Sequence, residues 1–398
     1  MVEKRLIGPR YKHPVSDGEL NRRLAAVQEA MKKEEIDCCI AQSQSTIFDS
    51  CIRYMVDIPT HQYATTLVIP AEGKMLLVNH GADNDNVTIP PSIRNVEKML
   101  TKPVCQTFGC TDNLLPETIV RELKGKGYKK IGFIMKQLIS FDFGEYLKEN
   151  LPGVEFVDFT KKFSKIKAVK SEEEWKLIDS CVRAHEHLID IVPALLRPGR
   201  MEYEILADLE HMSRYIKCDY IGNIAVGSAP AGQPATFYQN FAANRRVEPG
   251  DTLTVMVEVS GPGGIYGELA RSFCLGEPNK NLLELFDIAK QAQHVVAEAT
   301  KPGVTGADLD AVFNEFVASY GIPKNARFVG HGQGYDMMEA PTICPTEDMV
   351  IQEDMFFAIH PELFKDGEFA ICCDNFRVTK DGAVRLTRTP QEVFWVEI

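Results

Sequence analysis

The chain has 398 residues, of which 44% are hydrophobic and 25% are charged, a composition typical of a globular protein and not of a disordered one. Its net charge of −12 argues against nucleic acid or an anionic membrane as the main partner, so we expect a neutral or cationic small molecule. Chains longer than about 250–300 residues usually divide into domains, and we expect two here.

The number and spacing of the cysteines indicate whether the protein lies in an oxidising or a reducing compartment. There are 11 of them, an odd number, scattered without a repeated C-x-x-C spacing. This pattern indicates neither a disulfide framework nor a structural zinc module. No signal peptide is apparent at the N-terminus, and no apolar run is long enough to span a membrane. We therefore predict a cytoplasmic protein.

The first part of the chain alternates helical and extended patterns, which is typical of an α/β domain. Apolar residues at three- and four-residue spacing predict a helix over residues 17–35. Short apolar runs predict strands at residues 37–41, 63–69, 74–79 and 130–135.

A cluster of lysines marks the end of this domain. The apolar periodicity stops at residues 159–171, and residues 171–174 form a capping-box pattern that opens a new helix. We place the boundary here, giving domains 1–163 and 164–398. We interpret the lysines as a solvated connector.

The second domain has a different pattern. Several of its predicted strands are joined by short glycine-containing turns, which indicates a largely antiparallel α+β sheet. The predicted helices cover residues 171–195, 202–216, 282–298 and 306–319, and the predicted strands cover residues 222–227, 252–260, 265–275, 355–361, 368–378 and 384–387.

Candidate chemistry concentrates in this second domain. Glu258 and Glu268 lie on predicted neighbouring strands joined by a Gly-Pro-Gly-Gly connection, so both carboxylates could share one face. A buried Glu258 would need a partner charge, a metal or a shared proton, although two exposed carboxylates are the plainer alternative.

Two histidines extend this group. His331 is flanked by glycines, which permit close approach of a ligand, and His360 ends an apolar run. Cys372 and Cys373 are more simply explained as core residues. Carboxylates, imidazoles and a thiolate together could nevertheless hold a transition metal.

Several motifs then resemble one known family. The strings Gly330-His331-Gly-Gln-Gly334, Glu339-Ala-Pro341, His360-Pro361 and Asp374-Asn-Phe-Arg-Val378 occur in the order seen in the creatinase, prolidase and methionine aminopeptidase superfamily. The resemblance implies an α/β creatinase/prolidase-like N-terminal domain, an α+β pita-bread catalytic domain with a curved antiparallel sheet flanked by helices, and a homodimer.

The chain departs from this family at the metal ligands. Metal-dependent members hold two divalent ions with two aspartates, a histidine and two glutamates. The matching positions here are Glu258 or a neighbouring apolar residue, Glu268, His331, His360 and Cys373, and the family's second histidine is replaced by Met338. Because a histidine and a cysteine cannot bridge two hard ions as carboxylates do, we expect no dinuclear centre.

Comparison with creatinase, the metal-independent member, gives further departures. Its catalytic histidine falls on Gln239 and its substrate-holding glutamate on Ala270. The N-terminal loop that supplies a substrate-binding arginine in creatinase relatives carries His61 and Gln62 instead. We predict that substrate binding involves Glu258, Gln239, His61, Gln62, Cys373 and Arg271.

Our leading interpretation is a creatinase-like, metal-independent hydrolase that cleaves a C–N bond of a small cationic compound. His331 and His360 would act as general base and acid, and Glu268, with Glu258 or Glu339, would hold the substrate. No cofactor is expected, although a single zinc or iron ion at Glu268, His331, His360 and Cys373 stays open. The alternatives are a metal-dependent Xaa-Pro peptidase, a carbon–heteroatom lyase, and a catalytically silent binding protein.

Overall fold

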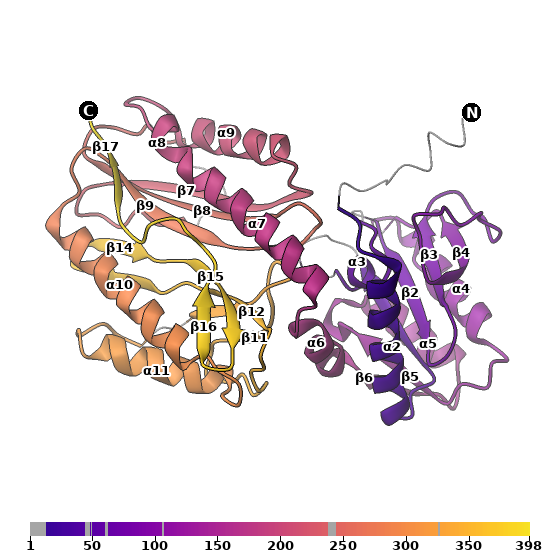
Figure 1. Cartoon of the computed structure of the whole chain (residues 1–398). Coiled ribbons are helices and arrows are strands. Elements are labelled where there is room, and N and C mark those ends of the chain that lie inside the picture. Colours follow the sequence, from indigo (N-terminus) through magenta and orange to yellow (C-terminus); the bar gives the residue numbers. More distant parts are fainter. Residues whose placement is uncertain are drawn as a thin grey trace. The chain divides into compact units, whose positions relative to one another are not determined.

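The computed structural model divides the chain into two compact units, Met1–Lys167 and Ala168–Ile398 (Figure 1). It describes residues 13–43, 48, 50–59, 63–105, 107–237, 244–324 and 327–398. The division lies after Lys167, close to the boundary expected after residue 163.

The N-terminal unit contains a six-stranded mixed sheet in the order β4-β3-β2-β1-β5-β6. β1 pairs in parallel with β5 and antiparallel with β2. The strands are β1 (Cys38–Ser43), β2 (Thr65–Pro70), β3 (Met75–His80), β4 (Val96–Lys102), β5 (Lys130–Ile134) and β6 (Glu155–Asp158). Four of these were predicted from apolar runs; β4 and β6 were missed because charged residues interrupt them.

Helices cover this sheet. α4 (Leu114–Leu123) and α5 (Phe141–Asn150) share a core with β1 and β5, in which Ile119 and Leu147 are fully buried. In Figure 1, α2 (Asp17–Lys33) lies across the sheet, near the short helix α3 (Cys51–Val56). α2 begins where Ser16 accepts a hydrogen bond from the Glu19 backbone N–H. The helix predicted at residues 17–35 is therefore confirmed, two residues shorter.

The lysine-rich segment is not a connector. It forms helix α6 (Thr160–Ala168), with Phe163 only 1% exposed and Lys167 only 5% exposed. The Lys167 ammonium lies 3.5 Å from the Ser50 hydroxyl and near the aromatic rings of Tyr54 and Phe163. The interpretation as a solvated connector is wrong because the apolar residues that alternate with the lysines pack inward.

The C-terminal unit is built on antiparallel sheets. One has the order β7-β8-β9 with β17 added in parallel, and another has the order β11-β10-β12-β15-β16. A separate hairpin joins β13 to β14. The strands are β7 (Tyr220–Pro230), β8 (Asp251–Ser260), β9 (Leu269–Leu275), β10 (Gly330–Gly332), β11 (Glu339–Thr342), β12 (Phe356–Ile359), β13 (Glu362–Lys365), β14 (Glu368–Ile371), β15 (Asp374–Thr379), β16 (Gly382–Arg385) and β17 (Phe394–Val396).

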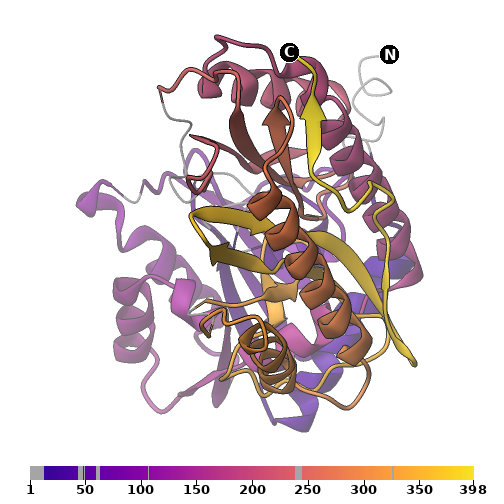
Figure 2. The ribbon, with the colours of Figure 1, turned by 90° about the vertical axis from the view of Figure 1, so that its left-hand side faces the viewer.

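Two groups of helices pack on these sheets. The first group covers β7, β8 and β9 and consists of α7 (Glu172–Asp190), α8 (Val192–Leu195) and α9 (Glu202–Tyr215). The second consists of α10 (Lys280–Ala299) and α11 (Gly306–Ala318), which pack against β12 and β14 (Figure 2). The capping box predicted at the start of α7 is present, with Ser171 and Glu174 exchanging hydrogen bonds.

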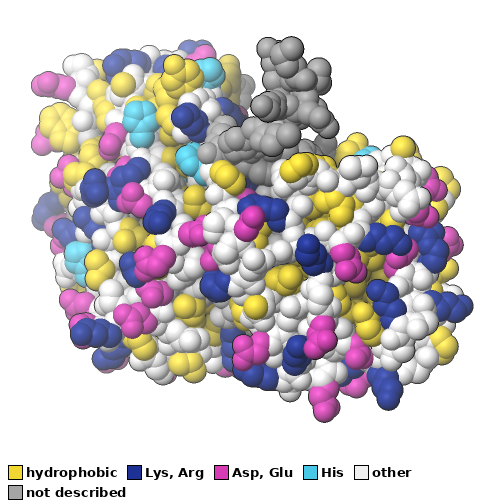
Figure 3. Space-filling view, turned by 45° about the vertical axis from the view of Figure 1, so that its right-hand side comes forward, with side chains coloured by type: hydrophobic (Ala, Val, Ile, Leu, Met, Phe, Trp, Pro, Cys, Tyr) yellow, Lys and Arg dark blue, Asp and Glu magenta, His cyan; other side chains and the backbone are white. Residues whose placement is uncertain are grey.

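The surface offers no strong charge segregation on the face drawn in Figure 3, where Lys and Arg side chains are interspersed with Asp and Glu. Among the described helices, none is long and apolar enough to cross a membrane.

Candidate active site

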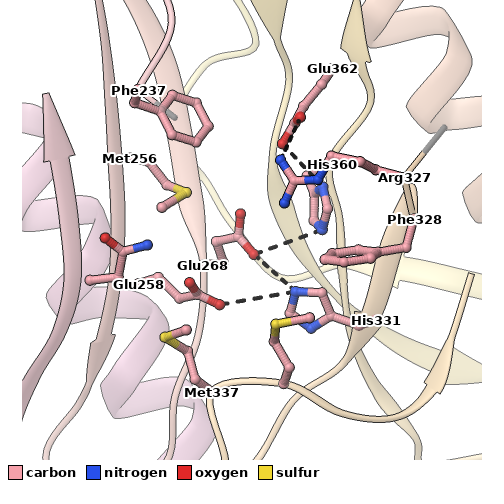
Figure 4. Close-up of a pocket in the computed structure, with 12 residues that line it drawn as sticks. Phe237, Met256, Glu258, Glu268, Arg327, Phe328, His331, Met337, His360 and Glu362 are labelled. Atoms are coloured by element: carbon pink, nitrogen blue, oxygen red, sulfur yellow. Dashed lines mark hydrogen bonds and ion pairs between the residues drawn. The ribbon is translucent and has the colours of Figure 1, made fainter. Parts of the chain in front are cut away.

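A cavity of about 360 Å³ opens within the C-terminal unit (Figure 4). One part of its wall carries carboxylates and imidazoles, and another part is apolar and rich in methionine. The lining residues are Asn223, Phe237, Met256, Glu258, Glu268, Arg327, Phe328, His331, Met337, Met338, His360 and Glu362. The four residues singled out from sequence motifs, Glu258, Glu268, His331 and His360, all lie here.

The two glutamates come from the β8–β9 hairpin. Glu258 lies near the end of β8, opposite Asn223 of β7, and Glu268 directly precedes β9. The backbone of Glu268 is fixed by Asn375, whose Oδ1 accepts from the Glu268 N–H at 3.0 Å and whose Nδ2 donates to the Glu268 carbonyl at 2.8 Å. β15 therefore anchors the residue that enters the cavity.

The two histidines come from neighbouring strands. His331 is the central residue of β10 and pairs with Ala358 of β12, and His360 directly follows β12. Antiparallel pairing brings the two imidazoles to the same end of the strands, with ring centroids 5.2 Å apart. The glycines beside His331 permit this pairing, because a Cβ on Gly330 would lie 2.5 Å from the Ala358 carbonyl oxygen.

One carboxylate oxygen lies between the two imidazoles. Glu268 Oε2 is 3.3 Å from His331 Nε2 and 4.0 Å from His360 Nε2. Glu258 Oε1 lies 4.0 Å from His331 Nε2 on the other side. All four side chains are nearly fully buried. The structure therefore brings together the predicted group as one cluster.

Hydrogen bonding in this cluster is incomplete. His331 Nδ1 lies 3.0 Å from the Gly332 carbonyl oxygen, and its Nε2 lies within hydrogen-bond distance of Glu268 Oε2, at 3.3 Å. Among the described residues, neither nitrogen of His360 has a hydrogen-bond partner, and neither does Glu258 Oε1.

Burial and mutual charge shift the pKa values of the cluster in opposite directions. Burial, reinforced by the neighbouring charge of Glu268, raises the pKa of Glu258 well above its usual range. Burial also opposes ionisation of Glu268, but the nearby His360 and His331 outweigh it and lower its pKa to about 2. Burial lowers the pKa of His360. The result is a neutral Glu258 beside an ionised Glu268, an arrangement typical of acid–base sites.

Two residues predicted for the site lie elsewhere. Arg271 is fully buried, and its guanidinium donates to Asp374 at 2.7 Å and to four backbone carbonyls. Glu339 accepts hydrogen bonds from Lys170 Nζ at 2.8 Å and from the Asp336 N–H at 3.2 Å. Neither is among the described residues that line this cavity, so their substrate-binding and catalytic roles stay predictions.

Cys373 lies beside the cluster. Its thiol hydrogen-bonds to Glu268, and burial raises the pKa of the thiol well above its usual range. It packs in an apolar group with Phe237, Met256 and Phe369. The remaining predicted substrate-binding residues, Gln239, His61 and Gln62, lie outside the described part of the chain.

The motif analysis missed the opposite side of the cavity. Arg327 and Phe328 immediately precede the glycine–histidine motif, and Glu362 lies two residues after His360. Glu362 Oε1 is 3.9 Å from His360 Nδ1, and Glu362 Oε2 is 3.5 Å from Arg327 Nη1. No motif indicated Glu362, which begins β13 after the break between β12 and β13.

The cluster fits one metal ion. Glu268, His331 and His360 offer ligand atoms within 4.8 Å of one another, in the described part of the chain. A tetrahedral ion with bonds of about 2.0–2.1 Å holds its ligands roughly 3.4 Å apart, so small side-chain movements suffice. Two imidazoles and one carboxylate are a zinc or iron donor set. These three ligands include one carboxylate, whereas a dinuclear centre needs carboxylates that bridge the two ions.

Comparison with known families divides the chain as the structure does. Residues 23–169 match the creatinase/prolidase N-terminal domain, and residues 176–389 match metallopeptidase family M24. The chain is 25% identical over 275 residues to the Xaa-Pro dipeptidase of Pyrococcus horikoshii, a match that covers 67% of this chain and 76% of that protein.

Solved structures share the same two-domain architecture. An Xaa-Pro dipeptidase from Bacillus anthracis superposes with a TM-score of 0.77 at 20% identity, covering 95% of this chain and all of that one. Dipeptidase PepE from Mycobacterium ulcerans gives a TM-score of 0.78 at 22% identity, covering 97% and 100%. The curved antiparallel sheet with flanking helices is thus the pita-bread fold. The chain belongs to metallopeptidase family M24 of the creatinase/prolidase superfamily, a family of hydrolases.

Proposed function

We propose that this chain hydrolyses a C–N bond of a small peptide-like substrate, acting with a single zinc or iron ion held by Glu268, His331 and His360. The observation that carries the proposal is the buried cluster of one carboxylate and two imidazoles, whose ligand atoms lie within 4.8 Å of one another and in which His360 has no hydrogen-bond partner among the described residues. Relatives named Xaa-Pro dipeptidases favour this over the metal-independent creatinase-like hydrolase expected from the sequence.

The chain's own residues supply the proton transfers. When bound, such an ion polarises a carbonyl group and acidifies water. Glu258 lies on the cavity wall, and burial raises its pKa and so favours its protonated form, so it can donate its proton to the leaving nitrogen and take one back from the attacking water. Met256, Met337 and Phe237 line the adjoining wall and exclude bulk water from this transfer.

Glu362 orients the imidazole of His360 from its Nδ1 side. It faces Nδ1 at 3.9 Å, the nitrogen opposite the one that approaches Glu268. A carboxylate behind a ligating imidazole fixes its orientation and raises its basicity. Glu362 is therefore a positioning residue in this scheme.

The test measures metal content and peptide hydrolysis together. We expect roughly one zinc or iron ion per chain by mass spectrometry of the purified protein, and loss of that ion in Glu268→Gln and His360→Ala. Hydrolysis of Xaa-Pro dipeptides should disappear on chelation and return with the metal. Arg377→Met is the control, because Arg377 pairs with Asp354 and does not line the cavity.

Other outcomes discriminate the alternatives. Turnover of a small C–N compound by metal-free protein would contradict the proposal and favour the two-histidine scheme. Stoichiometric metal without hydrolysis of any dipeptide would favour a lyase or a binding protein.

We also propose a homodimer, as the family resemblance implies, located in the cytoplasm, as the scattered cysteines indicate. Light scattering coupled to size-exclusion chromatography tests the assembly, and a mass of about 45 kDa would contradict it.

A further inference from the structure

Gln333 carries a side-chain amide that is fully buried and makes no well-formed hydrogen bond to any described residue, at either Nε2 or Oε1. Such groups are rare in folded proteins, because an amide that leaves water without gaining hydrogen bonds destabilises the folded state. A methionine or leucine of similar size would avoid this loss. The amide therefore calls for a reason other than the stability of the fold.

Strand geometry directs this amide to the same side as His331. The Gln333 N–H donates to the Phe356 carbonyl oxygen at 2.9 Å, which continues the pairing of β10 with β12 by one residue. Side chains two residues apart on a paired strand point to the same face. Because His331 Nε2 lies 4.0 Å from Glu258 Oε1, the Gln333 side chain also points toward Glu258. It does so from outside the cavity, whose lining does not include Gln333.

The glycines on either side of Gln333 fix its backbone. A Cβ on Gly332 would lie 2.8 Å from the Ala340 carbonyl oxygen, and a Cβ on Gly334 would lie 2.5 Å from Glu339 Oε1. Such close packing is possible only where no side chain is present. The main chain therefore holds the Gln333 amide at one place.

Glu258 is the group that this amide acts on. Burial and the charge of Glu268 raise the pKa of Glu258, whereas the side-chain amides of Asn223 and Gln333 act in the opposite direction. Asn223 lies opposite Glu258 in the pairing of β7 with β8 and lines the cavity. Two amides from different sheets thus flank one carboxyl group. Its Oε1, which faces His331 in Figure 4, has no hydrogen-bond partner among the described residues.

We propose that Gln333 is a positioning residue for Glu258 and holds its carboxyl group so that Oε1 faces the cavity. A glutamate side chain has several rotatable bonds, so a carboxyl group without neighbours would adopt several orientations. Asn223 restrains it from the cavity wall, and Gln333 restrains it from the side away from the cavity. The assignment of proton transfer to Glu258 rests on the proposed function; the contact between Gln333 and Glu258 does not.

The variant Gln333→Met removes the amide and keeps a side chain of similar length. With metal restored and alanylproline as substrate, we expect kcat to fall about 10- to 100-fold, because a misplaced proton donor transfers its proton poorly. KM and the metal content should stay those of the unmodified chain. The urea midpoint should not fall, because the lost amide made no well-formed hydrogen bond. A residue that only supports the fold would lower the midpoint and leave kcat unchanged.

Crystal structures test the contact without any substrate. In the unmodified chain, Gln333 Nε2 should lie within about 3.2 Å of a carboxyl oxygen of Glu258. In Gln333→Met, the Glu258 carboxyl group should move to another rotamer or divide between two, because one of its two restraints is lost.

Gln293→Met is the matched control. Gln293 is also fully buried, but its Nε2 donates to the carbonyl oxygens of Ile359 and Cys372, both at 2.9 Å. Replacing it removes the donor from two buried carbonyls, so the urea midpoint should fall. The kcat and the rotamer of Glu258 should stay those of the unmodified chain.

The outcomes separate this inference from the proposed function. A displaced Glu258 in Gln333→Met, together with no dipeptide hydrolysis by the unmodified chain, would leave the inference intact and refute the peptidase proposal. An unmoved Glu258 in Gln333→Met would overturn the inference, whatever the chain hydrolyses. A urea midpoint that falls as far as in Gln293→Met, or an unchanged kcat in a chain that does hydrolyse alanylproline, would also overturn it.

Discussion

Two buried charged groups lie close together in the C-terminal unit and differ in how completely they are satisfied. Around Arg271, every guanidinium nitrogen donates, and Asp374 accepts one further hydrogen bond from Gln391 Nε2. Around Glu268, the nearest imidazoles approach at 3.3 and 4.0 Å, and His360 has no hydrogen-bond partner among the described residues. Only three positions in the chain separate these two residues.

The difference shows which buried charges stabilise the fold and which are kept for a ligand. A buried ion pair with all its hydrogen bonds formed holds β9 to β15 and leaves no group for chemistry. A cluster with unpartnered nitrogens and oxygens is unfavourable unless something binds there. Burial alone does not distinguish the two, because both groups are almost completely enclosed.

Breaking the ion pair between Arg271 and Asp374 should have the largest effect on the free energy of unfolding. We expect Arg271→Met to lower the free energy of unfolding by about 3–5 kcal/mol, because it leaves Asp374 as an uncompensated buried charge. Urea denaturation followed by tryptophan fluorescence measures this in the C-terminal unit, since both tryptophans, Trp175 and Trp395, lie there. Arg271→Met with Asp374→Leu should restore much of the loss. An effect below 1 kcal/mol for the single variant would contradict the comparison.

Removing the charge of Glu362, which faces His360 Nδ1, should lower the affinity for metal and leave the free energy of unfolding unchanged. We expect Glu362→Gln to lower zinc affinity about 10- to 100-fold, because His360 loses the carboxylate that orients it. Competition with a chromophoric chelator measures the affinity directly. Asp354→Asn is the control, since Asp354 also pairs with an arginine but lies away from the cluster. Unchanged affinity in Glu362→Gln would remove its positioning role.

The smallest expected effect concerns His185, a buried histidine whose two ring nitrogens both have hydrogen-bond partners, in contrast to those of His360. His185 is completely buried, its Nδ1 lies 2.7 Å from the Cys181 carbonyl oxygen, and its Nε2 accepts from the Val259 N–H at 3.1 Å. Burial lowers its pKa from 6.5 to about 4. The folded state therefore binds the proton less readily than the unfolded state, and stability is lost as the pH falls from about 6.5 toward 4.

The variant His185→Gln tests whether His185 makes the protein less stable as the pH falls. The free energy of unfolding of the unmodified chain, minus that of the variant, should fall by roughly 1 kcal/mol between pH 7 and pH 5.5. Urea denaturation at both pH values measures it. A difference that is constant or grows as the pH falls would show that His185 is protonated in the folded protein.

Much of the architecture could be predicted because local patterns agree with the fold. The helices at residues 202–216, 282–298 and 306–319 form within two residues of the expected bounds, as α9, α10 and α11. The predicted strand at 368–378 is instead two strands, β14 and β15, because the chain changes pairing partner between Ile371 and Asp374. Period-2 patterns do not reveal which strand is the neighbour.

The cluster of glutamates and histidines in the cavity could be predicted from the sequence, but the other charged residues that line the cavity could not. Glu258, Glu268, His331 and His360 stand out because charged residues in apolar strands need a partner. Glu339 and Arg271 looked equally significant in sequence but are neutralised by Lys170 and Asp374. Arg327 escaped notice because an arginine in a loop usually lies in solvent.

The sequence by itself determined the family, the two-domain order and the residue types available for chemistry, because these follow from motifs and local periodicity. Only the tertiary structure decided which of the buried charges share a cavity and which are satisfied by partners far away in the chain. These properties depend on strand pairing across more than a hundred residues, such as that of Arg271 with Asp374. Local sequence carries no information about the distance between such residues.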